Sequence, residues 1–495
     1  MAIVACRNHF WVAVTERGGL LVRGRNDDGQ LGIGVQAAAL RPRALGGTGP
    51  FAGELAAELE GGMEALALLA DDAPEPPAAA LAHPFESKAA MVACGDEHTM
   101  CVTDDGAVWA WGLNASGALG IAHTQTPEQL AQNGHLQRSL VPLRWGPELC
   151  NGAPARMVAC GDYHTLVLTR AGEVWACGRG RQGQTGNPLF PEIVHSPERV
   201  PVLPATVQLV AAGSQFSGAV DADGEVWMWG AAYNDKLGFE QEDPGWRNQI
   251  AEPTKLGLAA FGGEPVVHLS LGCSQSAAVT PTGALWVWGS NDFGQLGLGD
   301  LMDYSIPTLV AAGGAPAWGG SCVLMAACGY LHKLVLTKDG CVWSCGQGEF
   351  GMLGDDDDSD IAVPVRIPPA AFGGARIVFV AAGPYHAFAV TAEGLMYFCG
   401  VDTLSPDYTP QETPIPVAAS LVPGLRIGRA CGIRRWHALV FCMGLDARLG
   451  ARATNRVLGT DTAGAVVERG VRLDGDLARM GEGLLRQLAV RERRD

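Results

Sequence analysis

VACGDYHTLVLTRAGEVWACGRGRQGQTG, residues 158–186, is the stretch of sequence that decides the fold. Its segments HTLVLT and EVWACG are short and rich in β-branched and aromatic residues, and the turn dipeptide Ala171-Gly172 lies between them. This pattern is typical of two antiparallel strands joined by a tight turn. Taken alone, the histidine behind Gly-Asp and the glycine-rich end could also belong to a catalytic loop or a phosphate-binding loop.

The same pattern recurs through most of the chain, as expected of a repeated structural unit. A complete copy has the form G-x-x-H-x-x-x-x-T-x-x-G-x-V/L-W-x-W/C-G-x-N-x-x-G-x-L-G. Copies start at Val4, Val92, Val158, Val210, Leu269, Ala326 and Val380, and a degenerate copy starts at Ala430. Anchor glycines open the pattern at Gly95, Gly161, Gly213, Gly272, Gly329 and Gly383. The repeated tryptophans are therefore expected to pack between neighbouring units.

A proline-led strand precedes each later copy, so one repeat contains about four strands. The prolines are Pro42, Pro142, Pro197, Pro253, Pro307, Pro364 and Pro414. A repeat of this size and strand content is typical of a β-propeller blade, because a closed ring buries both faces of each sheet. Seven such strands predict seven blades. We expect the N- and C-terminal segments to share a blade that closes the ring, with an eighth partial blade as the alternative.

The repeat closely resembles that of the regulator of chromosome condensation family, over roughly residues 1–450. The resemblance implies an all-β, seven-bladed β-propeller. We expect one propeller at 1–450 with insertions at 36–88 and 121–155, followed by a partly helical tail at 451–495. The founding member of the family is an exchange factor for the Ran GTPase, whereas many relatives are binding domains or scaffolds.

The first insertion and the tail carry helical patterns. Apolar residues of the insertion that can share one helical face are Leu55, Leu59, Met63, Leu66 and Leu69. The following APEPPAAA would end that helix. The segment is either a helical arm for a partner or a flexible acidic loop. Leucine and methionine recur at helical spacing in the tail, which predicts a short C-terminal helix.

The repeat histidines could be mistaken for a catalytic or metal site. Four of them follow their anchor glycine by three positions: His98, His164, His332 and His386. Ring symmetry would spread them around an axis, whereas such a site needs different groups to converge. The favoured interpretation is a histidine hydrogen-bonded within its own blade. The GDxH variant could instead face a protein partner, through Asp96 and His98 or through Asp162 and His164.

Motifs of covalent catalysis and of cofactor binding do not occur in the sequence. It has no GxxxxGK[ST], no HExxH, no GxSxG and no paired CxxC. The acidic run at 355–360 lacks the spacing of a calcium loop. We therefore expect no covalent catalysis, no cofactor and no metal.

Composition limits the partners and the compartment. The 495 residues carry a formal net charge of −17, which disfavours direct contact with nucleic acid. The sequence has no apolar run long enough for a membrane span and no secretory signal. Its 14 cysteines include no CxxC pair, which is typical of reduced thiols. We expect a cytoplasmic protein, with a nuclear, ciliary or organellar assembly as alternatives.

Two functions are compatible with these patterns. The favoured one is a non-enzymatic interaction propeller or scaffold subunit that binds a protein partner through loops of one face and the 36–88 insertion. The alternative is a guanine-nucleotide exchange factor for a Ran-like small GTPase, which works by differential binding of the nucleotide-free state. Exchange factors of the family use an inserted wedge. Its nearest counterpart here is WGAAYNDKLG, which is shorter and lacks the arginine of the family pattern. The candidate partner-binding residues are Asp96, His98, Asp162, His164, Tyr233, Asn234 and Asp235.

Overall fold

The computed structural model divides the chain into two compact units, Met1–Gly432 and Ile433–Asp495. The residues described are 4–7, 10–14, 18–33, 39–47, 82–83, 87–121, 138–146, 148–240, 249–310, 317–401, 410–417, 456–460 and 466–470.

Seven sheets make up the described part of the first unit, and each contains four consecutive antiparallel strands, which we label a to d. The first sheet has a short fifth strand that pairs in parallel. Blades 1 and 2 are β1 (Val4–Arg7), β2 (Phe10–Val14), β3 (Leu20–Gly24), β4 (Ala39–Gly47), and β6 (Ala89–Cys94), β7 (His98–Thr103), β8 (Val108–Leu113), β9 (Arg138–Arg144). Blades 3 and 4 are β10 (Ala155–Cys160), β11 (His164–Thr169), β12 (Val174–Arg179), β13 (Ile193–Arg199), and β14 (Val207–Ala212), β15 (Phe216–Asp221), β16 (Val226–Ala231), β17 (Gln249–Lys255). Blades 5 and 6 are β18 (His268–Leu271), β19 (Gln275–Val279), β20 (Leu285–Gly289), β21 (Tyr304–Leu309), and β22 (Val323–Cys328), β23 (His332–Thr337), β24 (Val342–Gly346), β25 (Ile361–Arg366). Blade 7 is β26 (Ile377–Ala382), β27 (His386–Thr391), β28 (Met396–Val401), β29 (Pro410–Pro416).

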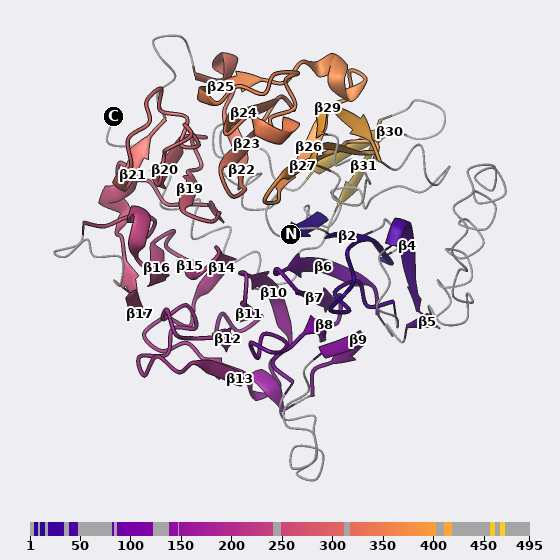
Figure 1. Cartoon of the computed structure of the whole chain (residues 1–495), viewed down its shortest axis with the longest axis vertical. Coiled ribbons are helices and arrows are strands. Elements are labelled where there is room, and N and C mark those ends of the chain that lie inside the picture. Colours follow the sequence, from indigo (N-terminus) through magenta and orange to yellow (C-terminus); the bar gives the residue numbers. More distant parts are fainter. Residues whose placement is uncertain are drawn as a thin grey trace. The chain divides into compact units, whose positions relative to one another are not determined.

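The a strands form a closed inner ring. Each contacts the a strand of the next blade, from β1 through β6, β10, β14, β18 and β22 to β26, and β26 contacts β1. Trp11 of blade 1 and Phe388 of blade 7 pack edge to face across this last junction, with ring centroids 6.0 Å apart. Figure 1 shows the seven sheets following one another around the a strands. The predicted seven-bladed propeller is confirmed.

The proline strands are the outer d strands, and each completes the copy that precedes it. In blade 3, Trp175 pairs with Arg199 and Gly178 with Val194, and the register shifts between these pairs, around Pro197. A missing N–H is tolerated there because d is an edge strand. The first copy thus has its own d strand, β4. The expected sharing of a blade by both chain ends is wrong for the described residues, which also contain no eighth blade in this unit.

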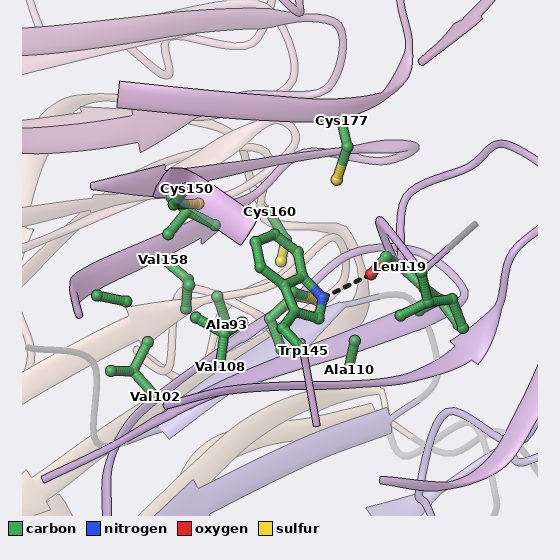
Figure 2. Close-up of a cluster of buried hydrophobic side chains, with 14 of the residues drawn as sticks. Ala93, Val102, Val108, Ala110, Leu119, Trp145, Cys150, Val158, Cys160 and Cys177 are labelled. Atoms are coloured by element: carbon green, nitrogen blue, oxygen red, sulfur yellow. Dashed lines mark hydrogen bonds between the residues drawn. The ribbon is translucent and has the colours of Figure 1, made fainter. Parts of the chain in front are cut away.

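The hydrophobic core lies between blades. Each of six buried clusters joins residues of two consecutive blades. Between blades 2 and 3, the Trp145 indole Nε1 donates to the carbonyl oxygen of Leu119 at 2.8 Å, beside Cys160 and Cys177 (Figure 2). Fully buried indoles of the repeat are Trp111, Trp229 and Trp288. The predicted packing of these indoles between blades is confirmed.

Helices in the described residues are 3-10 turns of three or four residues. The predicted helix at 55–69 and the predicted C-terminal helix lie outside the described residues. Within the 36–88 insertion, the first described part is the d strand β4, and β5 (Ala82–His83) pairs with it in parallel. Within the 121–155 insertion, the d strand β9 is described. In the second unit, β30 (Arg456–Thr460) and β31 (Val466–Gly470) form an antiparallel pair.

Candidate functional site

Antiparallel strands place the a–b and c–d loops at one end of every blade, which we call the loop face. Its described residues are 95–97, 161–163, 213–215, 272–274, 329–331 and 383–385 in a–b loops, and 25–33, 114–121, 179–192, 232–240, 290–303 and 347–360 in c–d loops. The two loop types are bonded to each other: Arg179 N donates to Tyr163 O at 2.8 Å, and Ala231 N to Gln215 O at 2.9 Å. The b–c turns and d–a connections form the opposite end, the turn face.

The anchor glycines allow each a–b loop to pack closely. A Cβ on Gly161 would overlap the ring of His164 and the carbonyl oxygen of Gly213 in the next blade. The anchor glycine and the histidine of the motif therefore depend on each other, because the imidazole occupies the space that a side chain would need. The glycine and the histidine therefore recur together in the repeat because the close packing of the a–b loop requires both.

The repeat histidines bind across the junction between blades. His98 Nε2 lies 3.1 Å from Thr165 Oγ1, and His164 Nε2 lies 2.9 Å from Ser217 Oγ. The Thr165 hydroxyl donates to the carbonyl oxygen of Ala118 in the preceding blade, so the imidazole Nε2 is the donor to Thr165. The expectation of a bond within one blade is wrong, because the hydroxyl that the histidine reaches is supplied by the next copy.

The candidate partner-binding residues of the GDxH loops differ in how deeply they are buried. His98 and His164 are 2% and 0% exposed, so they lie beneath the loop face. Asp162 is 7% exposed and Asp96 is half-buried, and Asp96 N donates to the carbonyl oxygen of Asp162 at 3.1 Å. The structure thus brings the two aspartates together on adjacent blades. The imidazoles of His98 and His164 are buried beneath them.

Tyr233, Asn234 and Asp235 form the 3-10 turn of the blade 4 c–d loop, on the same face. The Tyr233 hydroxyl donates to Gln215 Oε1 at 3.2 Å, and Asn234 Nδ2 donates to Ser274 Oγ of blade 5 at 3.2 Å. Asn234 and Asp235 have φ of 59° and 56°, in the left-handed region, which asparagine and aspartate adopt more readily than other residues with a side chain. Glycine occupies the position of Asp235 in the corresponding loops, for example Gly183.

Lys236 is a residue that the sequence reasoning missed, although it replaces the glutamine found at Gln30, Gln184 and Gln295. It is 0% exposed, and Nζ lies 3.5 Å from the ring centroid of Tyr233. Within the described residues, Nζ has no hydrogen-bond acceptor. Burial lowers the pKa of Lys236 to about 7, although Cys273 and Asp162 act in the opposite direction. Burial, with Cys273 and Asp162, raises the pKa of Tyr233 to about 12.

The two faces differ in charge. Carboxylates of the loop face are Asp27, Asp28, Asp96, Glu97, Asp162, Glu192, Asp235, Glu240, Asp292, Asp300, Asp303, Glu349, Asp355, Asp356, Asp357, Asp358 and Asp360. Its basic residues are Arg25, Arg179, Arg181 and the buried Lys236, and Arg138 at the start of β9 reaches Asp27 and Asp28 from the next blade. On the turn face, basic ends of d strands neutralise carboxylates: Arg199 Nε lies 3.2 Å from Glu173 Oε1, and Lys255 Nζ 3.2 Å from Glu225 Oε1. A basic protein surface would therefore be attracted to the loop face.

Two further observations concern the described residues alone. They contain no group of three or more histidine, cysteine or acidic residues arranged to hold a metal ion. They also contain no helix of the length and apolar character needed to cross a membrane.

Known proteins share this repeat and this fold. Residues 47–406 match the RCC1-like domain family. The chain is 29% identical over 320 residues to the ultraviolet-B receptor UVR8 of Arabidopsis thaliana, covering 63% of this chain and 65% of that protein. It is 30% identical over 313 residues to the mitochondrial RCC1 domain-containing protein RUG3 of the same plant, covering 62% and 64%. The chain thus spans somewhat less than two thirds of these curated relatives.

The crystal structure of Prp20p from Saccharomyces cerevisiae has the same architecture. Its TM-score is 0.60 at 21% sequence identity, with coverage of 98% of this chain and 100% of that one. The family match covers most of the chain, and it agrees with the seven blades and with the repeat that forms the junctions between them. The chain belongs to the RCC1-like domain family.

Proposed function

We propose that the protein is a non-enzymatic interaction propeller whose loop face binds a basic protein partner. The observation that carries the proposal is the excess of carboxylates on the loop face, held on loops that backbone hydrogen bonds fix to one another. Asp96 and Asp162 would contact the partner near the inner ring, with Asn234 and Asp235 in the next sector. A preorganised surface of this kind loses little entropy on binding.

A charge-neutralised variant tests the proposal. Asp27→Asn, Asp292→Asn and Asp358→Asn together remove three exposed carboxylates from the loop face. The matched control removes three from the turn face, with Asp104→Asn, Asp223→Asn and Glu393→Gln. Tagged full-length baits are compared by quantitative mass spectrometry of what they retain. Some proteins should be retained by both the wild type and the control. We expect the loop-face variant to retain at least severalfold less of them, and this difference should be larger at low salt.

Identical retention by all three baits would contradict a role for the charged loop face. The identified partner is then titrated against the same three proteins. We expect the loop-face variant to bind about tenfold more weakly, mainly through a slower association rate. The control should bind as the wild type does.

The 36–88 insertion is part of the same proposal, as a second contact. Residues 50–80 contain none of the described strands, and their deletion affects only the short pairing of β4 with β5, so the thermal unfolding midpoint should change little. We expect the deletion to lower partner retention. Undiminished retention would restrict the interface to the loop face. A cytoplasmic location stays a prediction, to be tested by imaging a tagged full-length chain.

Guanine-nucleotide exchange on a small GTPase is the second candidate. The observation that favours it is the pair of left-handed residues Asn234 and Asp235 on the loop face, because backbone strain of this kind clusters at functional sites. The structure of the yeast relative is described with binding properties to Gsp1p and histones. The test is release of fluorescent GDP from a panel of small GTPases on addition of the pure protein.

A matched variant sharpens the exchange test. Asp235→Gly restores the residue of the other loops and relieves the left-handed strain. If the loop acts as a wedge, we expect GDP release to fall at least severalfold while the fold is retained. A flat response across the panel with the wild type removes this candidate.

A further inference from the structure

A cluster of aromatic rings lies on the loop face at the junction of blades 6 and 7. Tyr385 comes from the a–b loop of blade 7 and Phe350 from the c–d loop of blade 6, and their ring centroids are 5.7 Å apart at 77°. Tyr330, from the a–b loop of blade 6, lies 6.2 Å from Tyr385. All three residues are half-buried. We call Tyr330, Phe350 and Tyr385 the aromatic site.

The backbone at Phe350 is strained. Its φ is 74°, in the left-handed region, whereas Phe293 occupies the corresponding position of blade 5 without a positive φ. This conformation accompanies the close edge-to-face contact of Phe350 with Tyr385. A strained residue persists where the surrounding contacts determine its conformation, which is common at binding sites.

Two other aromatic residues of the loop face have a cation supplied by this chain. The guanidinium of Arg179 lies 4.6 Å from the ring centroid of Tyr163, and Nζ of Lys236 lies 3.5 Å from that of Tyr233. A cation over the face of an aromatic ring is attracted by the electron-rich face. The Arg179–Tyr163 pair is therefore a cation–π contact on this face, and the Lys236 amine, whose pKa is about 7, makes one with Tyr233 in its protonated form.

Tyr385 is the counterpart of Tyr163, because each precedes the repeat histidine of its copy. Both carbonyl oxygens accept a bond from the c–d segment: Arg179 N donates to Tyr163 O at 2.8 Å and Val401 N to Tyr385 O at 2.9 Å. Valine thus replaces arginine at the position that supplies the cation. Among the described residues, none places a cation over the Tyr385 ring.

Two exposed acidic residues adjoin the backbone of the turn that holds Phe350. Glu349 is exposed and directly precedes Phe350. The backbone of Glu412, whose side chain is also exposed, packs against Gly351. These charges would attract a cationic side chain toward the rings, and the planar guanidinium group suits stacking on an aromatic face.

We infer that the aromatic site receives an arginine side chain of the partner, in place of the arginine that blade 3 supplies to Tyr163 from its own chain. This inference rests on the proposed function, in which the loop face binds a basic protein. The partner's guanidinium lies against Tyr385 and Phe350, with Glu349 beside it. The other carboxylates of the loop face attract a basic partner but do not orient it. Binding of one arginine at the aromatic site thereby sets the position of the partner on the loop face.

The test uses the full-length protein and a fluorescently labelled hexa-arginine peptide, with binding followed by anisotropy. Tyr385→Leu removes the aromatic face and keeps an apolar side chain. The matched control is Tyr163→Leu, the same change at the same loop position, where Arg179 already covers the ring. We expect Tyr385→Leu to weaken binding about three- to tenfold and Tyr163→Leu to leave it within about twofold.

Tyr385→Phe keeps the ring and guards against a loss that is due to misfolding. We expect it to bind as the wild type does, with all variants checked by thermal unfolding. Equal loss in Tyr385→Leu and Tyr163→Leu, or unchanged binding in Tyr385→Leu, overturns the inference. A hexa-lysine peptide that loses as much affinity in Tyr385→Leu overturns the assignment to arginine.

The loop-face variant with Asp27, Asp292 and Asp358 neutralised separates this inference from the proposed function. If that variant binds hexa-arginine more weakly while Tyr385→Leu binds normally, the aromatic site is refuted and the acidic face stands. If Tyr385→Leu alone weakens binding, the aromatic site is supported, and a contribution of Asp27, Asp292 and Asp358 is refuted.

Discussion

One hydroxyl group determines whether a repeat histidine has a hydrogen-bond partner. His164 reaches Ser217 in the next blade, whereas the corresponding residue for His332 is Ala387, which has no hydroxyl. In the described residues, both ring nitrogens of His332 are buried without a hydrogen bond. Burial, with a smaller contribution from His386, lowers the pKa of His332 to about 3. The imidazole is therefore neutral at physiological pH.

Ala387→Ser should stabilise the protein. The new hydroxyl would accept from His332 and donate to the carbonyl oxygen of Met352, to which Cys399 Sγ already donates. We expect a gain of about 1 kcal/mol in the free energy of unfolding, because a buried polar group gains its partner. Thermal or denaturant unfolding measures it. Ala389→Ser, in the same strand and also buried, is the control and should destabilise the protein.

Lys236 predicts a pH dependence of stability. Its pKa is lowered from 10.5 to about 7 by burial, so below pH 7 the folded state contains a buried charge. Between about pH 7 and 10.5 the unfolded chain binds a proton at this lysine that the folded chain does not. The free energy of unfolding therefore rises with pH over this range. Lys236→Gln, the residue of blades 1, 3 and 5, should stabilise the protein by about 1 kcal/mol or more at pH 6 and flatten this rise.

Denaturant titrations at pH 6 and pH 9 measure the effect of Lys236→Gln. The exposed Lys255 of the same blade provides the control, because Lys255→Gln removes a lysine that pairs with Glu225 at the surface. Its effect should be small at both pH values. A gain from Lys236→Gln that is larger at pH 9 than at pH 6 would contradict the assignment of a buried amine.

At the scale of the strand, the sequence predicted which segments are strands better than it predicted which strands pair with each other. Strand identity follows from local patterns such as HTLVLT and the glycine turns, and these patterns found the b and c strands. The d strand was assigned to the wrong copy, because its only signal is a proline and the long c–d loop before it hides the pairing. The His98–Thr165 bond was missed for a related reason, since it joins different copies of the repeat.

The candidate site was predictable in part. Asp96, Asp162 and Asp235 fall on one face because the repeat period places their loops there. The aromatic site depends on which rings meet across two blades, and the strain at Phe350 depends on local packing. Neither the contact between these rings nor the strain can be predicted from the spacing of residues along the sequence. The buried Lys236 could have been found from the glutamine that it replaces in aligned copies.

The junction between two blades is an element that can be tested directly. Trp111 is 0% exposed, and its indole Nε1 donates to the carbonyl oxygen of Gln30 in blade 1 at 2.9 Å. Trp111→Leu leaves a cavity and removes this bond, so we expect a loss of about 3 kcal/mol or more in the free energy of unfolding. Trp343→Leu, at a half-buried indole, should cost less. Equal losses would show that burial between blades is not what these indoles contribute.

At the scale of the whole propeller unit, the described residues of the last and first blades meet through strand and ring packing. Blade 1 is complete without a C-terminal strand, and the contact of β26 with β1 joins the last blade to the first. The other junctions are bridged by a hydroxyl, indole or thiol that donates to the preceding c–d loop. At the closing junction Trp11 stands at the position of those hydroxyls and meets Phe388.

The closing junction should therefore be the place where the ring opens. Trp11→Leu and Phe388→Leu each remove one side of the aromatic contact, and in a double-mutant cycle we expect a coupling of about 1 kcal/mol. Hydrogen exchange should rise first in β1 and β26 in either variant, and last in β14 and β15 of blade 4, because an opened ring frays from its two free edges. Trp229→Leu, between blades 3 and 4, is the control and should raise exchange there instead. Uniform loss of protection over all seven blades in Trp11→Leu would mean that the ring unfolds as one unit and that this junction has no special role.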